Sequence, residues 1–292
     1  MLWKRLRLTL EMIKFEHSVF ALPFALTGAL LAFREGGYQA VGHKLLWICI
    51  AMVGARSAAM AFNRLVDADI DARNPRTRTR HLPAGLLSRG STWVFVAVSS
   101  LVFVAAAYEL NPLCFHLAPL ALALLFSYSF TKRFTTFSHV VLGFCLGVAP
   151  AAAWIAVRGS LDLRILWLTA AVTFWTAGFD IIYSCQDFAF DCAEGLFSLP
   201  RRLGIGGALL VARAFHVIMV ASLLALVFML HLGLLALAGV AAIVGLLLYE
   251  HSLVKANDLS RVDAAFFTMN GYVSVLFFLF WAADILLLKP GA

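Results

Sequence analysis

Charged side chains are scarce in this sequence. Lys, Arg, Asp and Glu together make up 13% of the 292 residues, whereas 62% of the residues are hydrophobic. Soluble domains carry about 25% charged and about 45–50% apolar residues, so this composition excludes an ordinary water-soluble fold. Low-complexity segments and long linkers are also missing from the sequence. We therefore expect one membrane domain over residues 1–292.

Cysteine pairs and nucleic-acid motifs are absent as well. The five cysteines lie mostly inside apolar stretches, without CxxC spacing and without histidines at metal-ligand spacing. We interpret them as small buried hydrophobic residues. The net charge of +7 comes with no RNP, zinc-finger or basic-helix signature, which argues against nucleic-acid binding. In a membrane protein, such an excess of basic residues marks cytoplasmic loops.

Long apolar runs are what this sequence has in abundance. About 20 apolar residues make one membrane-spanning helix. About nine such windows lie near residues 17–34, 43–63, 91–110, 112–131, 137–157, 163–183, 206–230, 232–251 and 266–288. The basic segment Met1–Lys14 precedes the first window, which we interpret as a retained helix and not as a cleaved signal peptide. The sequence predicts an all-α, polytopic membrane protein.

The distribution of Lys and Arg predicts how the chain is oriented in the membrane. With nine spans and a cytoplasmic N-terminus, 17 of the 23 basic residues fall on the cytoplasmic side and five fall outside, while Arg56 lies within the second span. Basic loops favour the cytoplasmic side, so this asymmetry supports that topology and an external C-terminus. Two acidic segments then face the cytoplasm as well.

The first acidic segment lies at the end of the second span. Asn63, Asp67 and Asp71 follow one another at intervals of four residues, so a helix places them on one stripe. Oxygen-bearing side chains on one stripe repel one another unless a cation lies among them. Mg²⁺ is usually held by one or two carboxylates plus substrate phosphates. A solvated acidic helix end is the alternative, and this segment alone leaves both interpretations open.

The second acidic segment ends the sixth span. Asp180, Asp187 and Asp191 are spaced seven and four residues apart, which brings them within roughly 20° of one helical line. Tyr183 lies on the neighbouring edge of that face. Two helices would then carry acidic stripes at the same depth. Burying like charges together brings no structural benefit, and ionisable groups in a membrane are costly. The pairing therefore favours two metal-binding stripes that face one diphosphate.

Basic residues complete the pattern. Arg56 lies seven residues before Asn63, and so on the same helical face two turns deeper. An arginine inside a span needs an anionic partner, and both Asp180 and a carboxylate on an aromatic substrate qualify. A solvated charge and a phosphate clamp are the two roles open to Arg73, Arg76, Arg78, Arg80, Lys132, Arg133, Arg201 and Arg202.

These segments resemble the UbiA superfamily of intramembrane aromatic prenyltransferases. The resemblance rests on Asn63-x3-Asp67-x3-Asp71 with the run at 76–85 after it, and on Asp180-x2-Tyr183-x3-Asp187-x3-Asp191 with Gly195 and Ser198 after it. Further matches are Arg56, Lys14-Phe15-Glu16-His17, Phe20-Ala21-Leu22-Pro23 and the segment Tyr128–Thr135. The resemblance covers nearly the whole chain. One departure is Ser129, where many relatives have proline after the tyrosine.

Within the superfamily the chain looks most like the 4-hydroxybenzoate polyprenyltransferase branch. The segment Asp180–Leu203 also resembles menaquinone-pathway relatives that act on a futalosine-derived aromatic acid. The resemblance implies a nine-helix bundle around a central cavity that opens laterally to the lipid. It implies Mg²⁺ ligands at Asn63, Asp67, Asp71, Asp187 and Asp191, diphosphate-binding residues at Lys14, Arg73, Tyr128 and Lys132, and catalytic residues at Arg56, Asp180 and Tyr183.

The expected reaction is transfer of a polyprenyl group from its diphosphate to a 4-hydroxybenzoate-type aromatic acid, in quinone biosynthesis at a bacterial inner membrane. Mg²⁺ and basic side chains neutralise the departing diphosphate. Asp180 accepts a proton from the acceptor phenol. The ring of Tyr183, Tyr128, Trp175 or Phe179 faces the allylic cation. Other superfamily acceptors stay open, and so does a secondary transporter with carboxylates in the membrane.

Overall fold

The computed structural model describes residues 2–14 and 20–287, with side chains from Arg7 onward. In this part of the chain the secondary structure is helical, apart from one isolated bridge between Lys255 and Asp258. The predicted all-α fold is confirmed. The chain forms two compact units, one from residues 1–18 and 42–130 and the other from residues 19–41 and 131–292. The single domain over residues 1–292 stays a prediction.

Eight helices in the described residues are long and apolar enough to cross a membrane. They match eight of the predicted windows, including the window 112–131, which only Asn111-Pro112 separates from its predecessor. The window 17–34 begins outside the described residues. Its helix, α2 (Leu22–Gly36), has 15 residues, fewer than the about 20 that a span needs. The predicted number of nine is therefore approximate.

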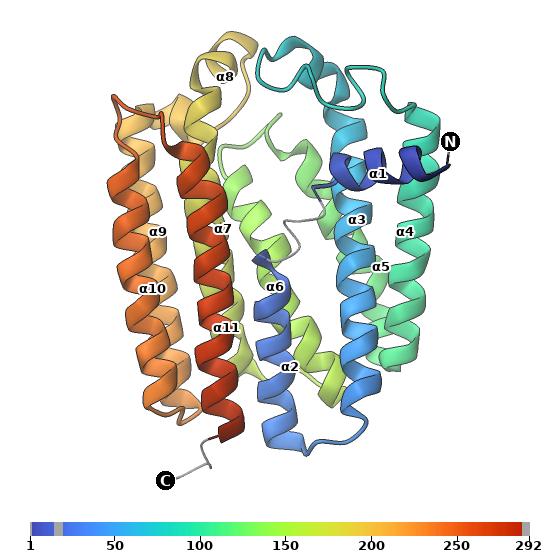
Figure 1. The fold of residues 1–292 in the computed structure, drawn as a ribbon, viewed down its shortest axis with the longest axis vertical. Helices are drawn as coiled ribbons and strands as arrows, with labels where there is room; N and C mark the ends of the chain where they lie inside the picture. Colours follow the sequence, from blue (N-terminus) through green and yellow to red (C-terminus); the bar gives the residue numbers. More distant parts are fainter. Residues whose placement is uncertain (1, 15–19, 288–292) are drawn as a thin grey trace. The chain divides into compact units, whose positions relative to one another are not determined.

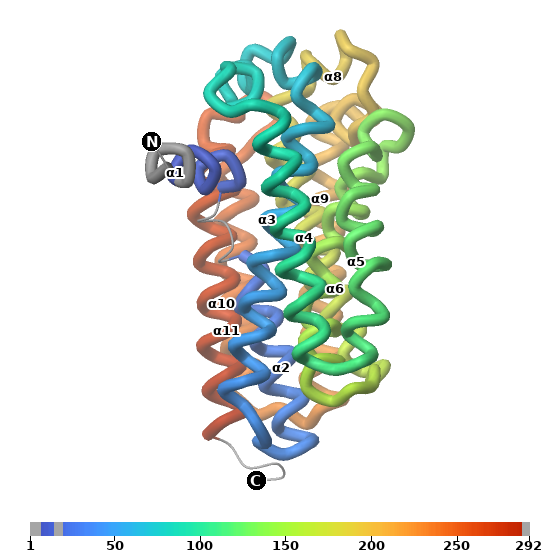
Figure 2. The backbone as a smooth tube through the Cα atoms, turned by 90° about the vertical axis from the view of Figure 1, so that its right-hand side faces the viewer, coloured from blue at the N-terminus to red at the C-terminus, as the bar shows by residue number. Residues whose placement is uncertain are grey.

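In the part of the chain that the structure describes, the first unit contains four helices. These are α1 (Leu2–Met12), α3 (Val41–Arg73), α4 (Arg89–Leu110) and α5 (Pro112–Thr131). Within this unit α4 and α5 run side by side in opposite directions (Figure 2). The ring of Phe62 on α3 stacks on Phe126 of α5, with centroids 4.4 Å apart. An added Cβ at Gly54 would lie 3.0 Å from the backbone nitrogen of Phe103, so this glycine lets α3 approach α4 closely.

The outer surfaces of these helices carry large apolar side chains. Leu101 on α4 is 69% exposed and Leu120 on α5 is 67% exposed. Contiguous apolar surface of this kind marks contact with lipid or with another protein. Helices satisfy every backbone hydrogen bond internally, so they are the elements that can lie in a hydrocarbon layer. The chain is accordingly an integral membrane protein.

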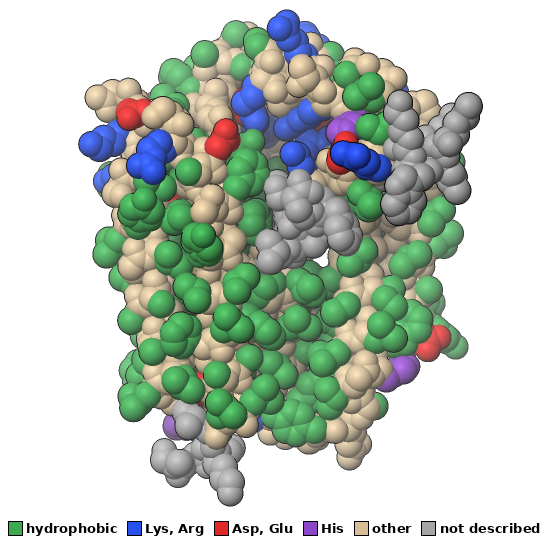
Figure 3. Space-filling model, in the orientation of Figure 1, with side chains coloured by type: hydrophobic (Ala, Val, Ile, Leu, Met, Phe, Trp, Pro, Cys, Tyr) green, Lys and Arg blue, Asp and Glu red, His purple; other side chains and the backbone are tan. Residues whose placement is uncertain are grey.

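The second unit contains α2 and all the helices from α6 onward. They are α6 (Ser138–Arg158), η2 (Leu163–Ile165), α7 (Leu166–Ser184), η3 (Cys185–Asp187), α8 (Phe188–Glu194), α9 (Leu199–Met229), α10 (Leu234–Leu253), η4 (Ala264–Met269) and α11 (Asn270–Leu287). Helix α7 packs along both α6 and α9, and α2 packs against α6 and α11 (Figure 1). Hydrophobic side chains cover the length of α10 and α11, with charged ones gathered near the loop between them (Figure 3).

Close helix approach in the second unit depends on glycines. An added Cβ at Gly143 on α6 would lie 2.2 Å from the carbonyl oxygen of Thr173 on α7, and at Gly28 on α2 it would lie 2.4 Å from the carbonyl oxygen of Pro150. Helix association in membranes relies on small residues because lipid gives no hydrophobic driving force between helices. Gly143 therefore allows α6 to lie close to α7.

Aromatic side chains fill the core of the second unit. The ring of Phe24 lies 4.9 Å from that of Trp175 and 4.5 Å from that of Phe277, measured between centroids. Trp175 and Phe179 are both buried in this core cluster. Buried aromatic rings contribute much of the packing energy of such a core. Trp175 and Phe179, two of the rings expected to face the allylic cation, therefore pack in the core of this unit.

Candidate active site

The first acidic row lies on α3, as the spacing predicts. The helix continues without a break from Asn63 through Asp67 to Asp71, and the amide nitrogen of Asn63 donates to Oδ2 of Asp67 at 2.9 Å. Asn63 and Asp67 are partly buried, whereas Asp71 is buried. This row therefore presents carboxylate and amide oxygens in a half-sheltered position.

The loop after α3 is tied back to the acidic row. Nη1 of Arg80 donates to both oxygens of Asp71, at 2.7 and 2.8 Å, and the hydroxyl of Thr77 donates to the backbone oxygen of Asp71 at 3.1 Å. The helix ends at Arg73, which is exposed. Arg80 therefore ties this loop to the first acidic row.

Arg64 is a second basic residue of the row that the sequence did not single out. Its guanidinium interacts electrostatically with Asp67, Asp71 and Tyr128, and its Nε donates to the backbone oxygen of Met12 at 3.3 Å. Tyr128 lies on α5, so this interaction brings one predicted diphosphate-binding residue to the acidic row of α3. The one feature of the sequence that could have indicated Arg64 is its position in the first acidic segment, one residue after Asn63.

The end of α1 reaches the deeper part of α3. Nη2 of Arg56 donates to the backbone oxygen of Lys14 at 3.4 Å, so two of the predicted site residues are in contact. Lys14 has a positive φ of 52°, and its backbone nitrogen donates to the Glu11 oxygen at 3.2 Å. A hydrogen bond from Arg7 lowers the pKa of the Glu11 carboxyl. Residues 15–17 of the quoted motif lie outside the described residues.

The second acidic row does not lie on one continuous α-helix, and here the prediction is wrong. Asp180 and Tyr183 lie on α7, Asp187 ends the 3₁₀ turn η3, and Asp191 lies on α8. A 3₁₀ helix advances about 120° per residue, against about 100° in an α-helix. Asp187 is therefore rotated from the line of Asp180 by roughly 20° for each residue of the turn.

Side chains at the end of α7 explain this turn. The hydroxyl of Ser184 and the thiol of Cys185 both donate to the backbone oxygen of Ile181, at 2.8 and 3.4 Å. Side-chain hydrogen bonds of this kind compete with the helical ladder. The backbone nitrogen of Cys185 donates to the backbone oxygens of Ile182 and Tyr183. These acceptors are nearer in sequence than the one an α-helix would use, so the helix narrows into a 3₁₀ turn.

Asp191 is the most buried carboxylate of the second row. It is 1% exposed and interacts electrostatically with Lys132 and Asp187, while its carboxylate lies next to the side chain of Ser198. The backbone nitrogen of Phe197 donates to the Lys132 oxygen at 2.8 Å, which holds the segment in place. Oδ2 of Asp191 is buried and accepts no hydrogen bond from the described residues.

Asp180 has a partner that the sequence did not indicate. Nδ1 of His139, at the start of α6, lies 2.6 Å from Oδ2 of Asp180. His139 is completely buried, whereas 19% of the Asp180 side chain is exposed. From the sequence, Arg56 on α3 is one possible partner of Asp180, whereas His139 lies on α6. Because 41 residues separate His139 from Asp180, no local pattern could have predicted the pair.

Tyr183 lies beside two phenylalanines of a π-helix. Its ring is 4.2 Å from that of Phe266 and 5.9 Å from that of Phe267, measured between centroids. Both phenylalanines belong to η4, and the amide nitrogen of Asn270 donates to the backbone oxygen of Phe266 at 2.8 Å. π-helical turns occur frequently at functional sites. The ring of Tyr183 is thus held within a small aromatic group.

The donor atoms of both rows suit a hard divalent cation. No group of three or more His, Cys, Asp or Glu side chains forms a metal site by itself in the described residues. Mg²⁺, however, needs only one or two carboxylates when phosphates complete its coordination. The buried Oδ2 of Asp191 is an acceptor that a cation would satisfy. The two rows belong to different units, and their approach to one diphosphate stays a prediction.

Comparison with known proteins decides the family. The model of the UbiA prenyltransferase family matches residues 21–283, which include both acidic rows. The chain belongs to this family. It is 30% identical over 236 residues to the 4-hydroxybenzoate octaprenyltransferase of Nitrosospira multiformis, and the match covers 80% of each chain. Membership of the UbiA family confirms the resemblance seen in the motifs and makes this chain a transferase of prenyl groups.

Solved structures of UbiA homologs have the same fold. The apo structure of a homolog from Aeropyrum pernix K1 is 35% identical, with a TM-score of 0.84, and the match covers 93% of this chain and 98% of that one. A homolog from Archaeoglobus fulgidus, solved with DMAPP and Mg²⁺, is 19% identical, with a TM-score of 0.74 and coverage of 96% and 99%. The second comparison concerns the fold alone.

Proposed function

We propose that this UbiA-family chain transfers a polyprenyl group from a polyprenyl diphosphate to a 4-hydroxybenzoate-type aromatic acid in quinone biosynthesis, and that it needs Mg²⁺. The observation that carries the proposal is the family match over residues 21–283, together with 30% identity to a 4-hydroxybenzoate octaprenyltransferase. The Archaeoglobus fulgidus homolog bound to DMAPP and Mg²⁺ supports a prenyl diphosphate and a divalent metal as ligands.

The acidic rows bind the diphosphate end of the substrate in this proposal. The residues that would hold Mg²⁺ are Asn63, Asp67, Asp71, Asp187 and Asp191. When bound, Mg²⁺ neutralises charge that develops on the departing diphosphate. Lys14, Arg73, Tyr128 and Lys132 contribute basic and hydroxyl groups around the same anion. Arg80 already occupies both oxygens of Asp71, so Asp67 and Asn63 are the more accessible ligands of the first row.

Asp180 removes the proton of the acceptor phenol in this proposal. An ionised carboxylate only accepts hydrogen bonds, so Nδ1 of His139 carries the proton that binds Oδ2. The buried imidazole thereby orients Asp180 and leaves its other oxygen for the phenol. Loss of the phenol proton raises electron density on the ring carbon, which attacks the allylic carbon as its bond to the diphosphate breaks. The proton on that ring carbon is then lost, which restores the aromatic phenol. Arg56 pairs with the carboxylate of the aromatic acid, because a guanidinium in a span needs an anion.

Aromatic and aliphatic side chains protect the allylic cation. The ring of Tyr183, packed on Phe266, offers a π face to a cation. Phe179, which belongs to the core cluster of the second unit, packs against the same Phe266. This cluster keeps water away from the ring of Tyr183 and so prevents hydrolysis of the allylic cation. The long prenyl tail needs no soluble pocket, since it can lie along apolar helix surfaces and in lipid.

The proposal includes the setting of the enzyme. The asymmetry of Lys and Arg supports a cytoplasmic N-terminus, a cytoplasmic site and an external C-terminus. The octaprenyltransferase relative is from Nitrosospira multiformis, which supports a bacterial inner membrane. Both units act as one prenyltransferase domain, because the family match runs through both.

The decisive test is a product assay. Membranes that contain the full chain are incubated with Mg²⁺, a polyprenyl diphosphate and a panel of aromatic acids, and products are identified by mass spectrometry while released diphosphate is measured. We expect a prenylated 4-hydroxybenzoate and one diphosphate per product, with both lost on addition of EDTA. Substrate binding without diphosphate release would favour a transporter and overturn the proposal.

The same panel separates the possible acceptors. It includes 4-hydroxybenzoate, a futalosine-derived aromatic acid and the acceptors of other superfamily branches. Prenylation of the futalosine-derived acid alone would assign the chain to the menaquinone pathway and contradict the 4-hydroxybenzoate assignment. Diphosphate release would still confirm the reaction class in that case.

A further inference from the structure

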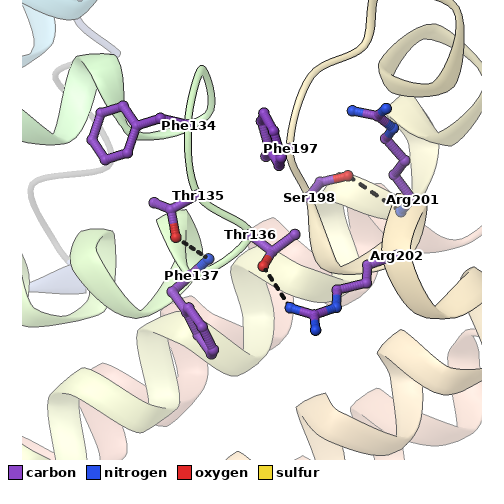
Figure 4. A pocket seen from close by; sticks show the side chains of 8 residues that line it. All are labelled: Phe134, Thr135, Thr136, Phe137, Phe197, Ser198, Arg201 and Arg202. Atoms are coloured by element: carbon purple, nitrogen blue, oxygen red, sulfur yellow. Dashed lines mark hydrogen bonds between the residues drawn. The ribbon is translucent and has the colours of Figure 1, made fainter.

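A pocket of about 460 Å³ opens on the second unit between the loop that joins α5 to α6 and the segment that leads into α9 (Figure 4). Two arginines, three hydroxyl-bearing side chains and three phenylalanines line it, and none of the eight lining residues is acidic. A pocket with two positive charges and no negative one attracts an anion. The carboxylates of the acidic rows do not line this pocket, although Asp191 lies next to the side chain of Ser198 in its wall.

Among the described residues, both arginines contact neutral groups. Nη1 of Arg202 donates to the hydroxyl of Thr136 across the pocket at 3.4 Å, and Nη1 of Arg201 donates to the backbone oxygen of Leu196 at 2.8 Å. The Arg201 guanidinium also lies 5.5 Å from the ring centroid of Phe197. A guanidinium has five N–H donors in a fork that matches phosphate oxygens. Each arginine thus keeps donors for a ligand.

The start of α9 fixes the backbone beside both arginines. Ser198 is the N-cap residue, and its hydroxyl accepts from the backbone nitrogen of Arg201 at 3.3 Å. The backbone is non-helical at Gly204, with φ of 70° and ψ of 165°, so the helical piece that carries the arginines is short. The positive charge of the pocket therefore comes from the two guanidinium groups.

The rim of the pocket is apolar and exposed. Phe134 is 65% exposed and Phe137 is 59% exposed. Both lie in the loop between Thr131, where the span α5 ends, and Ser138, where the span α6 begins. This position is the level of the lipid headgroups, where aromatic side chains are enriched. The pocket therefore combines phosphate-binding donors with a rim suited to lipid chains.

We propose that this pocket binds a phosphate group at the membrane surface without a metal. Two molecules present that chemistry there, an anionic phospholipid and free inorganic diphosphate. The proposal does not rest on the proposed function, because it concerns binding to residues outside the acidic rows.

The test uses the full chain purified in detergent, with EDTA present. Binding of phosphatidylglycerol, of phosphatidylcholine and of inorganic diphosphate is measured in separate titrations by native mass spectrometry and by the shift in melting temperature. The variant R201Q/R202Q removes both charges of the pocket. The control K255Q/R261Q removes two exposed charges from the loop between α10 and η4. The single variant R202Q serves if the double variant does not yield folded protein.

We expect R201Q/R202Q to bind one of the two anionic probes at least tenfold more weakly than the wild type, and R202Q at least threefold more weakly. The control should bind like the wild type. A loss confined to phosphatidylglycerol identifies a lipid headgroup, and a loss confined to inorganic diphosphate identifies a soluble anion. Equal binding by wild type and R201Q/R202Q, or an equal loss in K255Q/R261Q, would overturn the proposal.

Discussion

Oδ2 of Asp180 lies 2.6 Å from Nδ1 of His139, so a carboxylate on α7 and a completely buried imidazole on α6 form a pair inside the second unit. The pair exists because α6 and α7 approach closely at Gly143, one turn after His139. The other nitrogen of His139, Nε2, is buried and has no hydrogen-bond partner in the described residues. The imidazole therefore bonds to Asp180 and orients its carboxylate.

Replacing His139 should slow the chemical step. We expect His139→Ala to lower kcat for prenyl transfer about tenfold or more, because general-base catalysis contributes about 10²–10⁴-fold and depends on a positioned carboxylate. The KM for the prenyl diphosphate should stay within about twofold of the wild type, because the substitution does not change how this substrate binds. His139→Asn keeps a donor close to Nδ1 and should recover part of the rate. Steady-state kinetics with equal kcat for wild type and His139→Ala would contradict the role of this pair.

The acidic rows should be essential for turnover and dispensable for folding. We expect Asp67→Asn and Asp191→Asn each to lower the Mg²⁺-dependent rate about a hundredfold or more, because each removes a charge from the group that stabilises the departing diphosphate. Asp69→Asn is the matched control, since Asp69 lies on the same helix but is exposed and pairs with Arg89. Full activity in Asp67→Asn would disprove the metal assignment of the first row.

Arg56 should act on the aromatic acid and not on the diphosphate. We expect Arg56→Ala to raise the KM for the acceptor about tenfold or more, since a hydrogen bond to a charged group contributes about 1.5–3 kcal/mol. The KM for the prenyl diphosphate should change little. Titrating each substrate in turn at saturating levels of the other measures both values. A fall in kcat with both KM values unchanged would contradict this role and favour a pair between Arg56 and Asp180.

Arg80 should stabilise the end of α3. In Arg80→Ala the buried carboxylate of Asp71 loses the guanidinium that binds both of its oxygens, at a cost of about 1–3 kcal/mol. Arg78→Ala is the control, because Arg78 is exposed in the same loop. The melting temperature of the purified protein reports the difference. Adding Asp71→Asn to Arg80→Ala should restore part of the lost stability, and no recovery would argue against the ion pair as the cause.

The contact between α6 and α7 should not tolerate a methyl group at Gly143. An added Cβ would lie 2.2 Å from the backbone oxygen of Thr173, so Gly143→Ala should cost about 1–3 kcal/mol through overpacking. At Gly245 on α10 nothing lies within 4 Å of an added Cβ, and Gly245→Ala should be neutral or slightly stabilising. Thermal unfolding of both variants in detergent provides the comparison. Similar melting temperatures would mean that α6 and α7 can separate at little cost.

Local patterns in the sequence predict the spans and the first acidic row. Apolar run length is a local property that the thickness of a bilayer selects, so eight apolar helices lie over predicted windows. Several of these helices are longer than their windows: α3, for example, continues to Arg73, beyond the window 43–63. The spacing of Asn63, Asp67 and Asp71 is also local, and α3 runs through all three without a break. The family motifs depend on the same short spacings, and the match over residues 21–283 includes them.

The pairing of polar side chains, in contrast, depends on how the helices and loops pack. Spacing could not choose Arg80 among the neighbouring arginines, because the choice depends on how the loop folds back on Asp71. Spacing also could not show that hydrogen bonds to Ile181 convert the end of α7 into a 3₁₀ turn. His139 reaches Asp180 because two helices pack closely at a glycine. Periodicity describes one helix at a time, whereas the partner of a polar group is set by the packing of helices distant in the chain.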